Sequence, residues 1–325
     1  MSLQKEIFKK GNKGTALLEQ ALIEEQEDVD DSGKIIEEEA KKSNIRSFST
    51  LAYDIQGKSA NNSSPLFVLH HGVGYSALSF ALAALHIKNL TNGESTIFAY
   101  DFRGHGKTKT SDDLNLSLEQ LSQDLVDVLK AAFGNDVITN REIFLVGHSV
   151  GGCVVADAMS RKLIPSVTCM AVIDVVEGSA MEALSNMRNF CRNRPSEFKT
   201  LEDAILWSKK SGSIRNIESA RISIPCLLIE QETHTNIKKY TWRTDLAATQ
   251  PHWEEWFSGM SEKFLSSNAA KLLILAGKYQ LVVLPEAGHM VQEDMPERTA
   301  SALVDFWKRN EKLILPVKKP FINDK

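Results

Sequence analysis

The sequence predicts an α/β fold with a mostly parallel sheet, helices on both faces of that sheet, and an inserted helical cap. Three observations predict it. Short apolar runs alternate along the chain with longer amphipathic segments, which is the pattern of a doubly wound sheet. The apolar runs are continuous rather than alternating, as in strands that are covered on both faces. The stretch at about 179–265 instead contains consecutive helical patterns, which we interpret as an insertion over the edge where strands end.

Six apolar runs are the candidate strands of the sheet, and helical patterns separate several of them. Leu118, Leu121 and Leu125 repeat at intervals of three and four residues, which predicts an amphipathic helix. Ser117 before it and Gln120 three residues later form a capping box. A second helix is predicted at 300–307. The candidate strands are Leu66–His70, Thr96–Tyr100, Ile143–Val146, Met170–Val176, Leu272–Leu275 and Leu281–Leu284.

The last two candidate strands are unusually close in sequence. Only Ala276–Gln280 separates them, whereas a parallel crossover needs about a dozen residues or more. The pair is therefore either an antiparallel hairpin or the product of a deletion or an omission, and we favour the second interpretation. The short segment Gln231–Lys239 raises the same question within the predicted cap.

Composition and charge narrow the class of protein. The 325 residues include 38 Lys and Arg against 42 Asp and Glu, for a net charge of −4, which argues against a nucleic-acid-binding surface. No apolar run reaches the roughly 18 residues of a membrane span, and the N-terminus lacks the features of a secretory signal. We expect a cytoplasmic or nuclear protein whose four scattered cysteines are free thiols. Residues 1–45 are predicted to form a flexible, partly acidic tail, and residues 46–325 the folded domain.

The strongest chemical signal is Gly147-His148-Ser149-Val150-Gly151, which matches the G-x-S-x-G motif. It follows a candidate strand and precedes a helical pattern, the context in which this motif forms a nucleophile elbow. The sharp turn lifts the Ser149 hydroxyl above the sheet, and the glycines let neighbouring backbone approach without a Cβ clash. We therefore predict Ser149 as the nucleophile and the Val150 amide, at the start of the helix, as one oxyanion donor.

The loop after the strand at 66–69 is the second signal. Its sequence, His70-His71-Gly72-Val73-Gly74, occupies the place from which such folds supply the other oxyanion donor, and we assign Val73, with Gly74 close by. Paired histidines also occur in metal sites. However, neighbouring side chains of a strand point to opposite sides, and no carboxylate or cysteine cluster accompanies these two. A metal is therefore not expected at these histidines.

His289, in Glu286-Ala-Gly-His289 after the last candidate strand, is the predicted general base. It comes last in chain order, as the histidine of this type of triad does. A histidine at a helix N-terminus without a catalytic role is the alternative. His105 and His148 flank glycine turns and are interpreted as structural.

Asp174 is the predicted acid of the triad, because the segment after Leu272–Gly277 holds none. It lies in an otherwise apolar strand, where burial would be costly without a partner. An imidazole N–H would supply that partner, and the carboxylate would hold the ring in the correct tautomer. Glu177 is the rival acid, and Asp174 could also merely cap its strand.

The segment Asp101–Thr108 contains Gly-Lys-Thr but is not a phosphate-binding loop. A P-loop needs a glycine five positions before Gly106, and that position is Asp101. We interpret the segment as a tight turn that Asp101 and Arg103 hold together.

Three motifs, D-x-R-G-x-G, G-H-S-x-G-G and a late G-H, resemble the α/β-hydrolase superfamily over about Leu66–Lys308. Longer strings outside these motifs are similar to the protein phosphatase methylesterase family. They lie at Met170–Leu184, Arg194–Lys199, Ser211–Arg221, Tyr240–Leu246 and Gly288–Asp294.

The resemblance implies an α/β-hydrolase fold and a serine esterase without a cofactor. Its substrate and partner would be the methylated C-terminal leucine of the protein phosphatase 2A catalytic subunit. The nucleophile, acid and base of the family fall on Ser149, Asp174 and His289. The chain departs from the family in two places, since an acidic insertion before Tyr240 is nearly absent and the segment after Gly277 is short.

The cap is the expected contact surface for the phosphatase tail. Four of its arginines could offer charge to a substrate, or could simply be solvated: Arg192, Arg194, Arg215 and Arg221. Two other functions stay open at this point. One is a general carboxylesterase or thioesterase for small esters, and the other is a non-catalytic phosphatase-binding protein with a vestigial triad.

Overall fold

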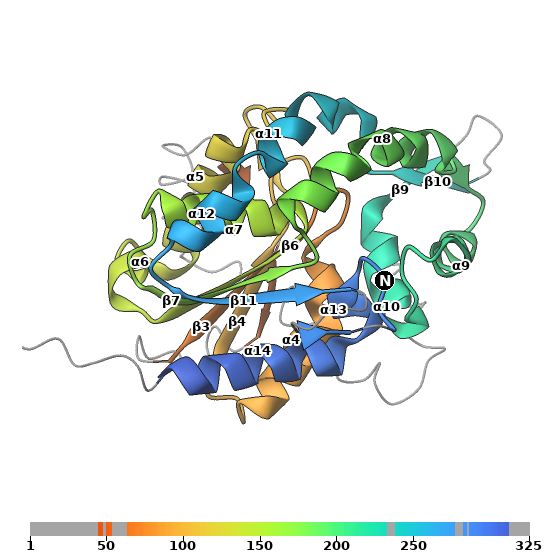
Figure 1. Cartoon of the computed structure of the whole chain (residues 1–325). Coiled ribbons are helices and arrows are strands. Elements are labelled where there is room, and N and C mark those ends of the chain that lie inside the picture. Colours follow the sequence, from red (N-terminus) through yellow and green to blue (C-terminus); the bar gives the residue numbers. More distant parts are fainter. Residues whose placement is uncertain are drawn as a thin grey trace, which may run out of the picture.

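A central sheet of seven strands carries helices on both of its faces (Figure 1). The computed structural model describes residues 45–47, 50–53, 64–232, 238–276, 282–284 and 286–311, so the predicted tail lies outside the described residues but for Ile45. The strands of the sheet are β2 (Thr50–Tyr53), β3 (Leu66–His70), β4 (Thr96–Tyr100), β6 (Ile143–His148), β7 (Val167–Ile173), β11 (Ala270–Leu275) and β12 (Val282–Val283).

The strand order is β12-β11-β7-β6-β3-β4-β2. Six strands are parallel, and β2 pairs antiparallel with β4. Every side chain of β3, β4 and β6 is buried, which explains why these strands read as continuous apolar runs. The predicted fold class is confirmed. A further two-stranded sheet pairs β1 (Ile45–Ser47) with β5 (Lys109–Thr110).

The two faces of the sheet form two separate cores, because neighbouring side chains of a strand point to opposite sides. On one face Leu66 and Val68 pack with the helices α5 (Leu118–Phe133), α7 (Val150–Ser160) and α12 (Met260–Ser266). On the other face Phe67 and Leu69 pack with α4 and α14. Helix α4 spans Ala81–Leu90 and α14 spans Pro296–Glu311. Three shorter helices complete the two layers: η1 (Ala77–Phe80), α6 (Val137–Asn140) and α13 (Val291–Asp294).

One half of the predicted capping box forms at the start of α5, whereas the Gln120 side chain donates to Asp124 and the Ser117 amide donates to Asn115. The Ser117 hydroxyl accepts a hydrogen bond from the Gln120 amide at 3.4 Å, and the helix ends at Gly134, whose φ of +86° suits glycine. Strand β7 begins three residues earlier than the predicted Met170–Val176 and ends at Ile173. The backbone turns there because Asp174 has a φ of +50°.

The two closely spaced strands are parallel, not an antiparallel hairpin. Ile274 of β11 pairs with Val282 of β12, and Leu275 pairs with Val283. The connection between them is too short for a crossover helix. The hairpin alternative is therefore wrong, whereas the preferred interpretation of a deletion or an omission stays a prediction, since residues 277–281 lie outside the described part of the chain.

The predicted cap is not purely helical. It contains a three-stranded antiparallel sheet, β8-β10-β9, in which β9 and β10 form a hairpin across the short 231–239 segment. A hairpin needs only a short loop, so a deletion is not required for the chain to close there. The elements are α8 (Glu177–Asn193), β8 (Glu197–Phe198), α9 (Leu201–Ser211), α10 (Ile217–Ser223), η2 (Ile224–Leu227), β9 (Leu228–Glu232), β10 (Lys238–Trp242) and η3 (Ala247–His252).

The tryptophan-rich end of the predicted insertion packs on the main core. Trp253, Trp256 and Phe257 of α11 (Trp253–Phe257) are buried with α5 and α7, and the Trp256 indole donates to the Leu116 carbonyl at 2.7 Å. A helical pattern shows that a face is apolar but not which core covers it. Within the described residues, no helix combines the length and the apolar character needed to cross a bilayer.

The turn after β4 is held by a buried ion pair. Two nitrogens of Arg103 donate to the two carboxylate oxygens of Asp124 at 2.8 and 2.7 Å, and both side chains are at most 2% exposed. The same guanidinium donates to Thr110 Oγ1 and to the Asp112 carbonyl. Asp101 accepts a hydrogen bond from the Ala77 amide at 2.7 Å, so both predicted turn residues do hold this region together.

Replacing Arg103 with alanine should lower the free energy of unfolding by about 3–5 kcal/mol, because the charge of Asp124 would stay buried without a cation. Urea unfolding followed by circular dichroism measures the loss. Arg298→Ala is the matched control, since its ion pair with Glu286 is exposed and should contribute at most about 1 kcal/mol. Equal losses in the two variants would contradict the structural role of the buried pair.

Candidate active site

Ser149 lies on a strained turn between β6 and α7. Its φ of +51° and ψ of −123° are unfavourable for a residue with a side chain. Two glycines make the turn possible. A Cβ on Gly147 would lie 2.2 Å from the Gly151 carbonyl oxygen, and one on Gly151 would lie 2.3 Å from the His70 carbonyl oxygen. The Ser149 amide donates to the Ile173 carbonyl at 2.9 Å, which ties the turn to β7.

The loop after β3 runs directly against this turn. A Cβ on Gly72 would lie 3.0 Å from the Ser149 Cβ, and the Tyr75 amide donates to the Gly72 carbonyl to close the loop. The Gly74 amide donates to His105 Nε2 at 2.8 Å and is therefore occupied. Val73, the neighbour predicted from sequence, remains the candidate oxyanion donor of this loop.

The second candidate donor, Val150, is the first residue of α7. The first amides of a helix have no partner within the helix, and the helix dipole favours a developing negative charge at that end. Val73 and Val150 therefore lie on two segments that flank Ser149, which is the arrangement an oxyanion site requires.

Asp174 and His289 form the hydrogen bond that the sequence predicts. Asp174 Oδ2 and His289 Nδ1 are 2.7 Å apart. The other carboxylate oxygen accepts from the Ala276 amide at 2.9 Å, and the Asp174 amide donates to the Ile274 carbonyl. Burial opposes ionisation of Asp174, but the hydrogen bond and charge of His289, with the Ala276 amide, lower the pKa of the carboxyl below its ordinary value. The carboxylate is thus ready to orient and stabilise an imidazolium.

The rival acid, Glu177, has a different task. Its carboxylate accepts hydrogen bonds from the amides of Gly259 and Ser261 at 2.8 and 2.9 Å, at the start of α12. These bonds lower the pKa of Glu177. Glu177 therefore caps α12 and does not contact the candidate base.

The loop that carries His289 is fixed on both sides. The Gly288 amide donates to Asp294 Oδ2 at 2.5 Å, and His148 Nε2 donates to the His289 carbonyl at 2.8 Å. Burial, then the charge of His289, lowers the pKa of His148 to about 3. His148 is accordingly neutral and carries its proton on Nε2. The sequence predicted a structural role for His148 but did not indicate that the His289 loop is its partner.

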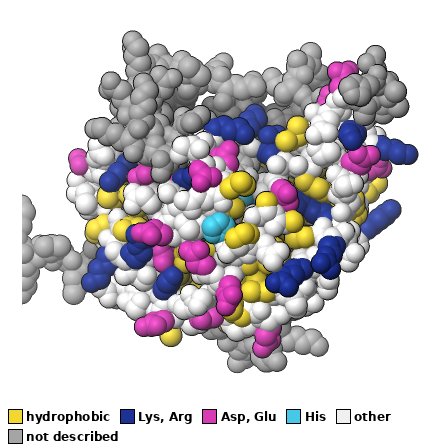
Figure 2. Space-filling model, turned by 90° about the horizontal axis from the view of Figure 1, so that it is seen from above, with side chains coloured by type: hydrophobic (Ala, Val, Ile, Leu, Met, Phe, Trp, Pro, Cys, Tyr) yellow, Lys and Arg dark blue, Asp and Glu magenta, His cyan; other side chains and the backbone are white. Residues whose placement is uncertain are grey.

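The imidazole of His289 is half exposed, so the candidate site opens to solvent. Figure 2 shows the face of the molecule above the view of Figure 1, where acidic and basic side chains are interspersed around a surface histidine. The paired residues His70 and His71 are instead fully buried at the end of β3. Within the described residues, no group of three or more potential metal ligands is present.

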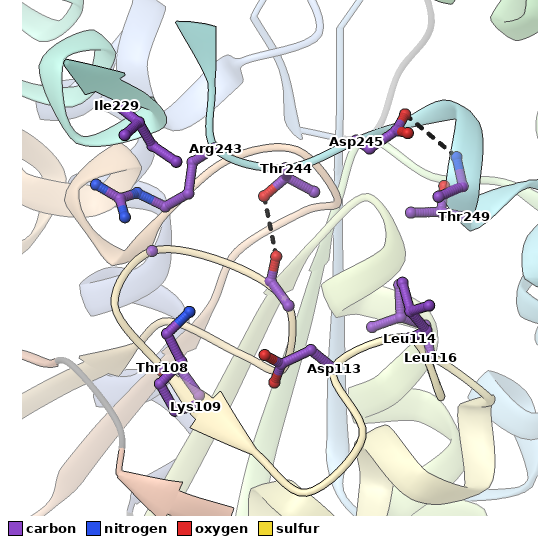
Figure 3. Close-up of a pocket in the computed structure, with 13 residues that line it drawn as sticks. Thr108, Lys109, Asp113, Leu114, Leu116, Ile229, Arg243, Thr244, Asp245 and Thr249 are labelled. Atoms are coloured by element: carbon purple, nitrogen blue, oxygen red, sulfur yellow. Dashed lines mark hydrogen bonds between the residues drawn. The ribbon is translucent and has the colours of Figure 1, made fainter. Parts of the chain in front are cut away.

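A separate pocket of about 280 Å³ lies between the loop after β4 and the segment after β10 (Figure 3). The Thr244 hydroxyl donates to the Gly104 carbonyl at 3.0 Å and joins its two walls. None of the candidate catalytic residues lines it. Leu246 packs closely on the loop after β3, since a Cβ on Gly74 would lie 2.7 Å from its Cδ2.

A buried carboxyl group follows His289 on α13 and was not singled out from sequence. Glu293 is 1% exposed, and its Oε2 accepts a hydrogen bond from the Ser223 hydroxyl at 2.5 Å. Its Oε1 and both polar side-chain atoms of Gln292 are buried without a hydrogen-bond partner among the described residues. Burial raises the pKa of Glu293 well above its ordinary value, so we expect this carboxyl to be protonated in the folded protein.

Known sequences share most of this chain. A family model described as the alpha/beta hydrolase family matches residues 67–302. The chain is similar to protein phosphatase methylesterase 1 of Aspergillus fumigatus, with 46% identity over 79% of this chain and 67% of the relative's length. The protein of the same name from Schizosaccharomyces pombe is 42% identical over 78% of this chain and 77% of its own length.

A third relative is longer than this chain within the matched region. Protein phosphatase methylesterase 1 of Neurospora crassa is 39% identical over an alignment of 359 positions, which covers 94% of this chain and 77% of that protein. The alignment is longer than the 325 residues of this chain. The relative therefore contains residues that this chain lacks.

Solved structures show the same fold. The crystal structure of E-2-(acetamidomethylene)succinate hydrolase matches with a TM-score of 0.60 and 19% identity, over 81% of this chain and 100% of that chain. An esterase from Mycobacterium tuberculosis matches with a TM-score of 0.56 and 18% identity, over 86% of this chain and 99% of that chain. At these identities the likeness concerns the fold alone.

Replacing Glu293 with glutamine should change how stability depends on pH. Above the ordinary carboxyl pKa of 4.5, the folded wild type retains a proton that the unfolded chain has released. Its free energy of unfolding therefore falls as the pH rises through this window, by up to about 1.4 kcal/mol per pH unit. Glutamine has no such proton to lose. The stability difference, variant minus wild type, should thus increase between about pH 5 and about pH 8 in urea titrations. A difference independent of pH would show that Glu293 is ionised.

Proposed function

We propose that this chain, which belongs to the protein phosphatase methylesterase family of α/β-hydrolases, removes the methyl ester from the C-terminal leucine of the protein phosphatase 2A catalytic subunit. The chain is a carboxylic ester hydrolase. The observation that carries the proposed mechanism is the 2.7 Å hydrogen bond between Asp174 and His289, formed next to the strained Ser149 turn. The named substrate rests on the similarity to relatives that carry the methylesterase name.

In the proposed first step, Ser149 Oγ attacks the ester carbonyl carbon while His289 accepts the hydroxyl proton. The negative charge that develops on the carbonyl oxygen is stabilised by the amides of Val73 and Val150, and such a donor typically contributes about 3 kcal/mol. Asp174 orients the ring and stabilises the imidazolium. His289 then gives the proton to the methoxide, which leaves as methanol.

The second step regenerates the enzyme. Water enters after methanol has left, and His289 accepts a proton from it as it attacks the acyl-enzyme carbonyl. The acyl-oxygen bond to Ser149 breaks, and His289 returns a proton to the serine oxygen. The products are free Ser149 and the terminal leucine carboxylic acid, which releases its proton to solvent and becomes the carboxylate. The half-exposed position of His289 is compatible with the entry of water.

Two other functions use the same fold and are separated by substrate choice. A general carboxylesterase would hydrolyse small esters at least as well as the methylated phosphatase. A phosphatase-binding protein would bind without releasing methanol. The assembled Asp174–His289 pair favours catalysis over binding alone, since an ionised carboxylate held to an imidazole has a clear catalytic use.

Ser149→Ala should abolish methyl release from carboxymethylated phosphatase 2A catalytic subunit, because the variant lacks the attacking oxygen. We expect a loss of at least about a thousandfold relative to wild type. Release of the labelled methyl group as methanol measures the reaction. Ser160→Ala, at the far end of the same helix α7, is the matched control and should retain wild-type activity.

Three outcomes would contradict parts of this proposal. Methyl release by Ser149→Ala would exclude Ser149 as the nucleophile. Hydrolysis of nitrophenyl esters without methyl release would indicate a general esterase. Inactivity of the wild type on both substrates, with retained binding of the phosphatase, would indicate a binding protein.

A further inference from the structure

Arg194, at the end of α8 in the inserted region, has an unusual environment for a charged side chain. Its guanidinium stacks on the Trp242 indole, with Cζ 3.4 Å from the ring centroid. Its Nε is buried and has no hydrogen-bond partner among the described residues. Burial lowers the pKa of Arg194 to about 10, which still leaves the side chain charged at neutral pH.

No carboxylate balances this charge within the described residues. The groups that act on it are the Tyr75 hydroxyl and the Cys191 thiol. Burial raises the pKa of both, so both are neutral at physiological pH. Arg103 and Arg221 differ, because they pair with the carboxylates of Asp124 and Glu218. Arg141, another buried arginine without a carboxylate partner among the described residues, donates instead to the Ser64 carbonyl and to Thr96 Oγ1.

The arginine is held in place before any ligand arrives. The Trp242 indole that stacks on the guanidinium also donates to the carbonyl of the next residue, Pro195, at 2.7 Å. The Arg194 amide in turn donates to the Phe190 carbonyl at the end of α8. Stacking occupies a face of the planar guanidinium, and because Nε is buried, the two terminal nitrogens are the donors left for a ligand. The geometry is therefore that of a preorganised donor.

The surroundings place Arg194 near the candidate catalytic residues. Tyr75 closes the oxyanion loop, and its ring centroid lies 6.2 Å from that of His148, the neighbour of Ser149. On the other side of the same loop, His105 accepts a hydrogen bond from the Gly74 amide. Burial lowers the pKa of His105 to about 4, and the charge of Arg194 contributes to this shift. Arg194 therefore lies within electrostatic range of Tyr75 and His105, the two residues that frame the loop next to Ser149.

From this arrangement we infer that Arg194 binds a carboxylate of the peptide, either in the methylated substrate or in the hydrolysed product. The inference deepens the proposed function and rests on it. A buried charge is costly unless it is paired, and the edge of a guanidinium matches a carboxylate with two parallel hydrogen bonds. The bound substrate would supply the partner that the protein itself does not.

Two carboxylates of the same reaction fit this chemistry. The methyl ester itself is uncharged, so a carboxylate in the substrate has to come from a side chain that precedes the esterified leucine. Hydrolysis creates a second carboxylate, at the terminus of the product. Binding of the first would favour acidic substrates, whereas binding of the second would produce inhibition by the product.

The test uses the full-length protein and synthetic peptide α-methyl esters that end in leucine. One series carries Asp at each of the three positions before the leucine, a matched series carries Asn, and a third consists of the free acids. A small uncharged nitrophenyl ester reports on the catalytic machinery alone. Three variants are compared. Arg194→Gln removes the charge, and Arg194→Lys keeps the charge but lacks the paired N–H donors of a guanidinium. Arg192→Gln changes an exposed neighbour and serves as the control.

We expect Arg194→Gln to lose roughly ten- to hundredfold in binding of the carboxylate ligand, the usual effect of deleting a charge-assisted hydrogen bond. The loss should appear as a higher KM for the Asp esters if a side chain is bound, or as a higher inhibition constant for the free acids if the product is bound. The loss of carboxylate binding in Arg194→Lys should be smaller than in Arg194→Gln, and Arg192→Gln should bind like wild type. Turnover of the nitrophenyl ester should not change.

Two results would overturn the inference. The first is equal kinetics of wild type and Arg194→Gln on all three peptide series. The second is a parallel loss on the nitrophenyl ester, which would show that Arg194 only supports the packing of Trp242. If the wild type itself fails to hydrolyse any peptide ester while it hydrolyses the nitrophenyl ester, the proposed function fails instead, and free-acid binding by Arg194 still decides the inference.

Discussion

The close approach of β3 to the start of α7 is the constraint on which the candidate site depends. The His70 carbonyl lies where a Cβ of Gly151 would be, so the helix can begin there only with glycine at that position. This contact holds the Ser149 turn in its strained conformation and brings the loop at Gly72 against it. The carboxyl ends of β7 and β11 meet at the same edge of the sheet, where the Ile274 carbonyl and the Ala276 amide fix Asp174. The parallel sheet therefore brings Asp174 and His289 into contact beside the Ser149 turn, although 115 positions separate the two residues.

Much of the fold could be predicted because its strands are buried on both faces. Continuous apolar runs predicted β3, β4 and β6 to within a few residues, and the capping signal predicted the start of α5. The three-stranded sheet of the insertion was missed, since β9 and β10 are mostly exposed and carry charged residues, so they lack the apolar signal of a strand. The choice between Asp174 and Glu177 could not be made by spacing alone, because it depends on which backbone amides reach each carboxylate.

Three groups of buried ionisable side chains differ in how their charge is balanced. Arg103 and Asp124 neutralise one another in a buried pair. The histidines around Ser149 stay neutral, since burial lowers the pKa of His70, His105 and His148 well below 6.5. Arg194 alone among these groups carries a charge that no described neighbour balances, and it does so beside the oxyanion loop. Sequence patterns could name Arg194 as one of four arginines but could not separate it from the others, because pairing is a property of the fold.

The most direct test of the proposed catalytic arrangement is to map the site of reaction with a fluorophosphonate probe by mass spectrometry of the digested protein. Such probes phosphonylate a serine whose hydroxyl is activated by a base, and fluoride is the leaving group. We predict a single adduct, on Ser149, and much slower labelling of Asp174→Asn, because the amide would hold the His289 ring in the wrong tautomer. An adduct on another residue, or labelling of Asp174→Asn at the wild-type rate, would contradict the assignment of Ser149, His289 and Asp174 as one catalytic unit.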